Sequence, residues 1–145
     1  MFLLELIESV WDEVMARLRP LRRGASATRA RGDLAEDFAL EFLRRQGFTL
    51  LMRNLSDERG EIDLVGRQKG FDGIVVVEVR ARQEGGLVAP REAVNRRKQR
   101  QVVKTARRLL PRHQMHGPLR FDIVGVWLNE QHEPVRAERF EGAFK

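Results

Sequence analysis

Two acidic residues stand inside stretches that otherwise have the composition of buried β-strands. Asp63 lies in GEIDLVG, residues 60–66, and Glu78 lies in IVVVEVRA, residues 74–81. Buried carboxylates that lie close together repel each other and lose hydration, so they persist only when a cation or another partner offsets their charge. Carboxylate oxygens on neighbouring strands can surround one hard cation such as Mg²⁺, which keeps several waters in its shell. The pattern therefore predicts that Asp63 and Glu78 bind a hard divalent cation such as Mg²⁺.

Arg80 follows Glu78 by two residues, so both side chains leave the same face of the expected strand. A metal ion lowers the pKa of a bound water, and a neighbouring cation stabilises the charge that gathers on phosphate oxygens. These residue types therefore suit hydrolysis of a phosphodiester bond, with Arg80 as the stabilising cation. A second interpretation stays open, in which Arg80 forms a cross-strand ion pair with Asp63 or Glu61. Glu61 itself is expected to face solvent.

The positive charge of the chain is concentrated in one segment. The formal net charge is +6, and residues 91–112 hold nine Lys or Arg and one acid, whereas the rest of the chain holds 18 bases and 20 acids. A local basic excess of this kind is typical of proteins that bind a polyanion, although it is also compatible with a solvated helix face. The expected contacts to a nucleic-acid backbone are Arg96, Arg97, Lys98, Arg100 and Lys104.

Periodicity gives a coarse order of elements. Apolar residues at helical spacing predict helices over residues 33–46 and 90–110, and apolar runs predict strands over 48–54, 60–66, 74–81 and 120–128. Residues 54–60 read as a polar turn, and the tail from Val135 to Phe144 adds at most a short strand. Strict alternation places Asp63 with Glu61 and Val65 on one face of its strand, opposite Ile62 and Leu64. The fold class expected is α/β, with a central mixed sheet flanked by helices.

The first 31 residues are expected to be an appendage, and residues 32–145 a single domain. Apolar residues recur at helical spacing over residues 2–18, and the basic, small-residue segment 21–32 reads as a linker. This amphipathic helix is expected to pack on the protein itself or on a second copy, which makes a homodimer possible. The acids along it argue against an anionic membrane surface. The chain has no cysteine, which excludes disulfides and fits a cytoplasmic protein.

The ordered motifs of residues 31–144 resemble the YraN-like (UPF0102) family, a bacterial group assigned to the restriction-endonuclease-like, PD-(D/E)xK nuclease fold. The motifs that carry the resemblance are AEDFALEFLRRQGF, RN in LLMRN, GEIDLVG, VVVEVRAR, AVNRRKQRQVVKTA, RFDIVGV and the terminal GAF. The resemblance implies an αβββαβ core, binding of nucleic acid and cleavage assisted by Mg²⁺ or Mn²⁺.

The resemblance also implies roles for single residues. Asp63 matches the central metal ligand, Glu78 matches the second ligand, and Glu36 in the first helix matches an acid that completes the metal site in related nucleases. Arg80 stands where the family motif has lysine, and an arginine holds phosphate well but is a poor proton acceptor. Lys98 or Lys69 would then supply the missing lysine, and Lys98 is preferred.

Three functions follow from these residues. The first is a metal-dependent endonuclease that cuts nucleic acid, expected to be DNA, with branched or structured DNA as a substrate that the wider fold class implies. The second is a protein that keeps the nuclease fold and binds nucleic acid with weak or absent catalysis, because Arg80 replaces the lysine. The third is an interaction protein whose N-terminal helix docks a partner.

Overall fold

The computed structural model describes residues 27–85 and 94–145. The amphipathic helix expected over residues 2–18, and the start of the basic helix expected from residue 90, lie outside the described residues. The elements in chain order are helix α2 (Ala27–Arg44), strands β1 (Phe48–Asp57), β2 (Gly60–Gln68) and β3 (Ile74–Gln83), helix α3 (Arg96–Leu109), the 3₁₀ helix η1 (Leu110–His113), and strands β4 (Leu119–Leu128) and β5 (Pro134–Phe144).

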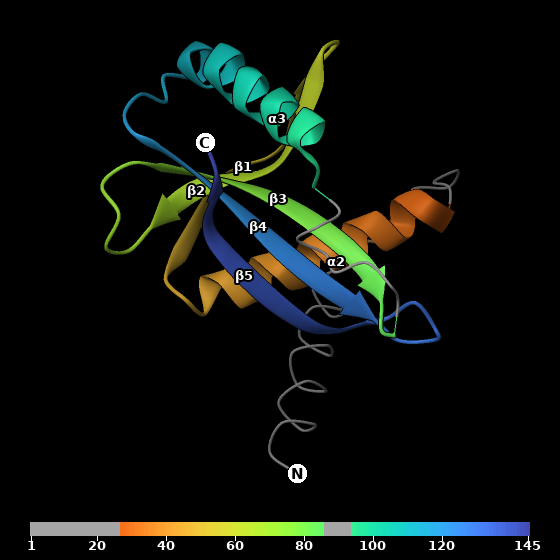
Figure 1. Ribbon diagram of the computed structural model, residues 1–145. Coiled ribbons are helices and arrows are strands. Elements are labelled where there is room, and N and C mark those ends of the chain that lie inside the picture. The colour runs from red at the N-terminus through yellow and green to blue at the C-terminus, as the bar shows by residue number, and fades with distance from the viewer. Residues whose placement is uncertain (1–26, 86–93) are drawn as a thin grey trace.

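The five strands form one mixed sheet in the order β1-β2-β3-β4-β5. Strands β3 and β4 are parallel and every other neighbouring pair is antiparallel, because α3 provides the crossover between β3 and β4. Helix α2 covers one face of the sheet and α3 covers the other (Figure 1). The predicted α/β class with a central mixed sheet flanked by helices is confirmed, and the elements from α2 to β4 follow the predicted αβββαβ order.

Each helix buries an apolar stripe against its own face of the sheet. On α2 the buried positions Ala35, Phe38, Ala39 and Leu43 recur every three or four residues and pack on the sheet. On α3 the buried positions, which lie against the opposite face, are Val102, Val103, Ala106 and Leu109. None of the described helices combines the length and apolar character needed to cross a lipid bilayer.

Three expected boundaries were wrong. Helix α2 begins at Ala27, so part of the expected linker is helical. Strand β1 continues to Asp57, because its pairing with β2 runs to the pair Asp57 and Gly60, and the turn is reduced to two residues. The tail is a full strand of 11 residues, since it pairs along most of β4.

The strict alternation expected for β2 was also wrong. Ile62 packs on the α3 face and Leu64 packs on the α2 face, so the two residues are not on one face. The change occurs at Asp63, where β2 loses its pairing with β3. In β3 the expected alternation is confirmed: Val75 and Val77 pack on the α2 face, and Val76 packs on the α3 face.

Candidate functional site

The candidate site lies where β2 and β3 separate. The two strands pair through three residue pairs, of which Leu64 and Val77 form the last. Just beyond this last pair each strand carries an acid: Asp63 precedes Leu64 on β2, and Glu78 follows Val77 on β3. The Oδ2 atom of Asp63 accepts a hydrogen bond of 2.8 Å from the backbone N–H of Val79. A carboxylate thus replaces the backbone partner that the diverging strand no longer offers.

Glu78 is buried, with only 3% of its surface exposed. Its Oε1 atom lies 2.9 Å from Nη2 of Arg80 and 3.6 Å from Nζ of Lys98, which reaches the sheet from α3. Its Oε2 atom is buried, and no N–H donor of the described residues reaches it. An unsatisfied buried carboxylate oxygen is costly, and a hard cation that prefers oxygen ligands would satisfy it. Asp63 and Glu78 therefore fit a divalent cation.

Electrostatics support the same conclusion. Burial, and then the negative charge of Asp63, raise the pKa of Glu78 to about 8, against the opposing charges of Lys98 and Arg80. Burial also raises the pKa of Asp63, and the hydrogen bond from the Val79 amide opposes that change. The pair consequently holds a proton near neutral pH, in a place where a divalent cation could neutralise it instead.

Arg80 forms its ion pair with Glu78, its neighbour on the same strand. The sequence had left open a cross-strand ion pair between Arg80 and Asp63 or Glu61. The structure shows the pair with Glu78 instead. Glu61 is exposed, as expected. The Nε atom of Arg80 is buried without a hydrogen-bond partner among the described residues, so this guanidinium retains an unused donor at the site.

Glu36 reaches the same region from α2. Its side chain is buried, and its Oε2 atom lies 3.3 Å from Nη2 of Arg53. Burial, and then the charge of Asp63, raise the pKa of Glu36 to about 7, while Arg53 opposes the shift. Within residues 27–85 and 94–145, no group of three His, Cys, Asp or Glu side chains is arranged to hold a metal ion. The role of Glu36 as third ligand stays a prediction.

Arg53 is a residue of this region that the sequence did not assign. It donates to the carboxylate of Asp37, the carboxylate of Glu36 and the backbone oxygen of Asp33, and so it joins β1 to α2. The available signal was an arginine directly after the apolar run LLM in the expected strand. A charged residue at such a position requires partners, and here the partners are the acids of the first helix.

The basic residues predicted to contact nucleic acid divide into two sets. Lys98 is partly buried and its amine faces Glu78, so it belongs to the candidate site. The other four are exposed on α3: Arg96, Arg97, Arg100 and Lys104. The structure thus joins Asp63, Glu78, Arg80 and Lys98 in one place and leaves the remaining bases on the outer surface of the helix.

The raised pKa of Glu78 predicts a pH dependence of stability in the absence of metal. Between the ordinary pKa of 4.5 and about 8, the folded protein retains a proton on Glu78 that the unfolded chain has released. The folded state therefore binds more protons, and the free energy of unfolding falls as the pH rises through this window. Glu78→Gln removes this titration and is expected to flatten the decline of Tm between pH 5 and pH 9, measured by calorimetry in EDTA.

The matched control is Glu61→Gln, which alters an exposed acid of β2. Its Tm is expected to follow the wild-type curve across the same pH range. A wild-type Tm that stays constant or rises from pH 5 to pH 9, or the same slope in Glu78→Gln, would contradict the proposed state of Glu78.

The amino-acid sequence is similar to a family of bacterial proteins. The model of the family described as "Uncharacterised protein family UPF0102" matches residues 35–126, which include α3 and most of the sheet. A UPF0102 protein from Porphyromonas gingivalis is 38% identical over 79% of this chain and 83% of its own length. A UPF0102 protein from Desulforapulum autotrophicum is 39% identical over 79% of this chain and 92% of its own.

A solved structure, that of a repair endonuclease from Pyrococcus abyssi, aligns with 75% of this chain and 40% of its own length. The TM-score is 0.33 and the identity is 15%, and a similarity at this level carries no inference about fold or function. The family model covers well over half of the chain, and the two relatives are aligned over most of their length. The chain belongs to the UPF0102 family.

Proposed function

We propose that this protein is a metal-dependent endonuclease that hydrolyses phosphodiester bonds of nucleic acid, with DNA as the expected substrate. The observation that carries the proposal is the buried Oε2 atom of Glu78, which no N–H donor of the described residues reaches, in a carboxyl group next to Asp63 and two cationic side chains. Asp63 and Glu78 would hold Mg²⁺ or Mn²⁺ at the point where the two strands separate. When bound, the cation would lower the pKa of a water and make it a nucleophile at neutral pH.

The two cations of the site have different capacities. An arginine is a poor proton acceptor, so Arg80 would stabilise charge on the phosphate oxygens and would not act as a base. Lys98 approaches the same carboxylate from α3, at 3.6 Å from Glu78 Oε1. An ammonium group is thus present at the site although the strand position carries arginine. We assign to Lys98 the contact with substrate phosphate that a lysine on the strand would otherwise make.

One observation favours the second candidate function, nucleic-acid binding without efficient cleavage. Glu78 Oε1 is already engaged by Arg80 at 2.9 Å, and a guanidinium at this position competes with a metal ion for the carboxylate. In that case the fold would hold nucleic acid, while the weak site for the cation would limit the reaction.

The proposed function is tested with the purified full chain and end-labelled substrates, namely a linear DNA duplex, a four-way DNA junction and an RNA duplex. Cleavage is expected with Mg²⁺ or Mn²⁺ and is expected to disappear with EDTA. Preference among the three substrates identifies the substrate class. If no substrate is cut with either metal, or if Asp63→Asn cuts as fast as the wild type, the endonuclease proposal fails.

Arg80→Lys is expected to increase the cleavage rate about tenfold or more. A lysine at this position can take part in proton transfer, a contribution that is typically worth about 10²–10⁴-fold in enzymes, whereas an arginine cannot. The measurement is the single-turnover rate with saturating Mn²⁺. Arg82→Lys makes the same change two residues along β3, on a side chain that donates to the Ala81 carbonyl, and is expected to leave the rate unchanged. An equal or lower rate in Arg80→Lys would show that the arginine does not limit the chemistry.

A further inference from the structure

A second basic feature lies apart from the carboxylates, between α3 and the turn that joins β1 to β2. It is a groove of about 480 Å³, which we call the α3 groove. Among the residues that the structure describes, the lining holds no acidic and no aromatic side chain. It consists of Arg59, Arg97, Arg100, Gln101, Lys104, Thr105 and Arg108. The α3 groove is therefore strongly positive, and neither Asp63 nor Glu78 lines it.

The helix contributes its cations as one stripe. Arg97, Arg100, Lys104 and Arg108 follow one another at intervals of three or four residues, which places them on one side of α3. Lys98 is one position on from Arg97, about 100° around the helix axis, and its amine faces Glu78. The helix therefore presents one cation to the candidate active site and a separate row of cations to the α3 groove.

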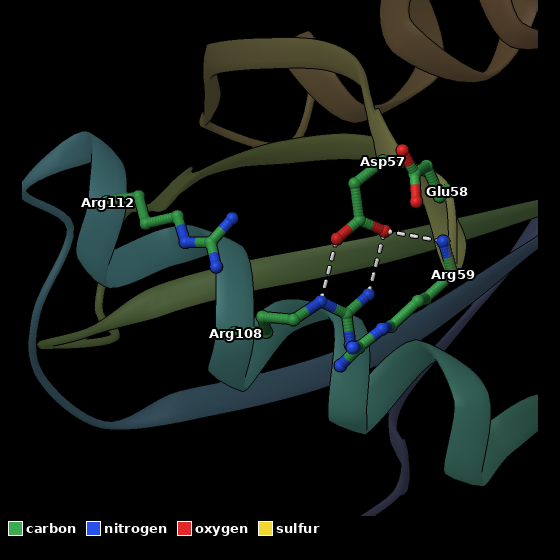
Figure 2. A pocket seen from close by; sticks show the side chains of 5 residues that line it. All are labelled: Asp57, Glu58, Arg59, Arg108 and Arg112. Carbon is green, nitrogen blue, oxygen red and sulfur yellow. Dashed lines mark hydrogen bonds and ion pairs between the residues drawn. The ribbon is translucent and has the colours of Figure 1, made fainter.

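The other wall of the α3 groove, the β1–β2 turn, is fixed to the helix by Asp57. Its carboxylate accepts hydrogen bonds from the backbone N–H groups of Arg59 and Gly60, at 2.9 Å and 3.1 Å, which shapes the turn. The same carboxylate accepts two bonds from the guanidinium of Arg108, at 2.7 Å and 2.8 Å (Figure 2). A two-bond arginine–carboxylate pair has a defined orientation, so the turn and the helix hold each other in place.

Two further contacts close the turn onto the helix. The side-chain amide of Gln101 donates to the backbone oxygen of Arg59 at 3.3 Å. A Cβ atom placed on Gly60 would lie 2.2 Å from Oγ1 of Thr105, so only glycine permits this approach. The position of Arg59 opposite the helix cations is therefore built by local structure, and the groove is more than a group of unconnected surface charges.

We propose that the α3 groove binds the phosphodiester backbone of nucleic acid and holds the strand next to the candidate active site. This proposal rests on the proposed function and adds a binding site to it. Asp57 neutralises Arg108, but the described residues show no ion pair for Arg59, Arg97, Arg100 or Lys104. Phosphates are suitable partners for such side chains because arginine forms paired hydrogen bonds with phosphate oxygens.

The extent of the row identifies the ligand as a polymer of phosphates. Lys104 follows Arg97 by seven positions, and at a rise of about 1.5 Å per residue the two side chains begin roughly 10 Å apart along the helix. A single free phosphate would engage only part of this row. None of the described residues that line the groove is aromatic, so contacts to the backbone rather than base stacking are expected, and binding is expected to be independent of base sequence.

The test is the binding of a fluorescein-labelled DNA duplex of arbitrary sequence, measured by anisotropy at a series of KCl concentrations in EDTA, so that no cleavage occurs. The groove variant carries Arg59→Ala, Arg100→Ala and Lys104→Ala. Its Kd is expected to rise at least about 30-fold. The slope of log K against the logarithm of the KCl concentration is expected to become less steep by about three units, because each of the three lost phosphate contacts contributes about 0.9 to that slope. Inorganic phosphate at the same ionic strength is expected to compete only weakly.

A control variant loses three exposed bases elsewhere, through Arg44→Ala, Arg136→Ala and Lys145→Ala. It carries the same net charge as the groove variant, and its Kd is expected to stay within about threefold of wild type, since its side chains lie outside the groove. Gly60→Ala tests the geometry at unchanged charge, because it pushes the turn away from Thr105. Its Kd is expected to rise severalfold in samples whose circular dichroism matches the wild type.

The outcomes separate the two proposals. Equal weakening in the groove and control variants, or wild-type affinity in the groove variant, overturns the α3 groove as the binding site. Binding that depends on the groove, in a protein that cuts nothing with Mg²⁺ or Mn²⁺, supports the groove and overturns the endonuclease proposal. Competition by inorganic phosphate as strong as that by duplex DNA overturns the assignment of a polymeric ligand.

Discussion

Asp63→Asn is expected to reduce the metal-dependent cleavage rate by at least about 1,000-fold, a loss of about 4 kcal/mol of transition-state stabilisation. Asparagine has nearly the same shape, and its amide oxygen can still accept the hydrogen bond from the Val79 N–H. The variant therefore retains the connection between the diverging strands. What it loses is the negative charge, which is required to hold a divalent cation between Asp63 and Glu78.

The measurement is the single-turnover rate on the preferred substrate, together with the rise in Tm that saturating Mn²⁺ causes. Both the rate and the Mn²⁺-induced rise are expected to disappear in Asp63→Asn, while the duplex Kd in EDTA stays close to the wild-type value. Glu61→Gln removes an exposed acid two residues earlier on β2 and serves as the matched control. If Asp63→Asn keeps more than about a tenth of the wild-type rate, the metal is held elsewhere or the reaction does not need it.

The sequence was informative about this site because the relevant relations are local. Glu78 and Arg80 share a face of β3 by the two-residue period of a strand, and the structure joins them at 2.9 Å. Lys98 was the preferred candidate for the missing lysine, and its amine does face Glu78. The proximity of Asp63 to Glu78 followed from the expectation that consecutive strands pair, which β2 and β3 do.

An acid inside an apolar strand does not by itself distinguish a functional site from a structural ion-pair network. Asp122 is also an acid within an apolar strand, RFDIVGVWL, yet it lies between two arginines and outside the candidate site. Its partner Arg139 comes from β5, which the sequence described as at most a short strand. The partners of a buried acid depend on which strands become neighbours and where they bulge, and that information is not contained in the local pattern.

The remaining differences between the predicted and the observed structure concern the ends of elements and contacts between residues that are distant in the chain. Residues 54–57 have the composition of a turn, but pairing with β2 extends the strand through them, because a completed ladder outweighs local preference. The α3 groove needs Arg59, which lies in a turn far from the helix in the chain and is brought there by Asp57 and Arg108. The basic helix could be predicted from charge, whereas the second wall of its groove could not.

The second large effect concerns stability, and it is expected for Asp122→Asn. The carboxylate of Asp122 is fully buried and accepts two hydrogen bonds from Arg120, two from Arg139 and one from the backbone N–H of Gly142. Arg139 is itself almost completely buried, with 4% of its side chain exposed. Loss of the carboxylate charge would leave its guanidinium with only the exposed carboxylate of Glu141, 3.8 Å away, as a counter-charge. Removing one partner of a buried ion pair typically costs about 3–5 kcal/mol.

This network joins elements that are distant in the sequence. Arg139 also donates to the side-chain oxygens of Gln46, after α2, and Gln68, at the end of β2. The bonds of Asp122 to Arg139 and Gly142 form where β5 carries extra residues opposite β4, so the carboxylate holds an irregular part of the sheet together. Asp122→Asn is therefore expected to loosen β5 and the end of α2 while the contacts of Glu78 remain.

The free energy of unfolding is measured by urea denaturation, with Asp72→Asn as the control for an exposed aspartate. The control is expected to change stability by less than about 0.5 kcal/mol, as is usual for surface substitutions. Arg120→Ala gives an intermediate case, since Arg139 and the Gly142 N–H still satisfy the carboxylate.

A loss below about 1 kcal/mol in Asp122→Asn would contradict the expected energy. A loss of the predicted size is a large part of the roughly 5–15 kcal/mol that stabilises a domain, so the urea midpoint of Asp122→Asn is expected to fall clearly below that of the wild type.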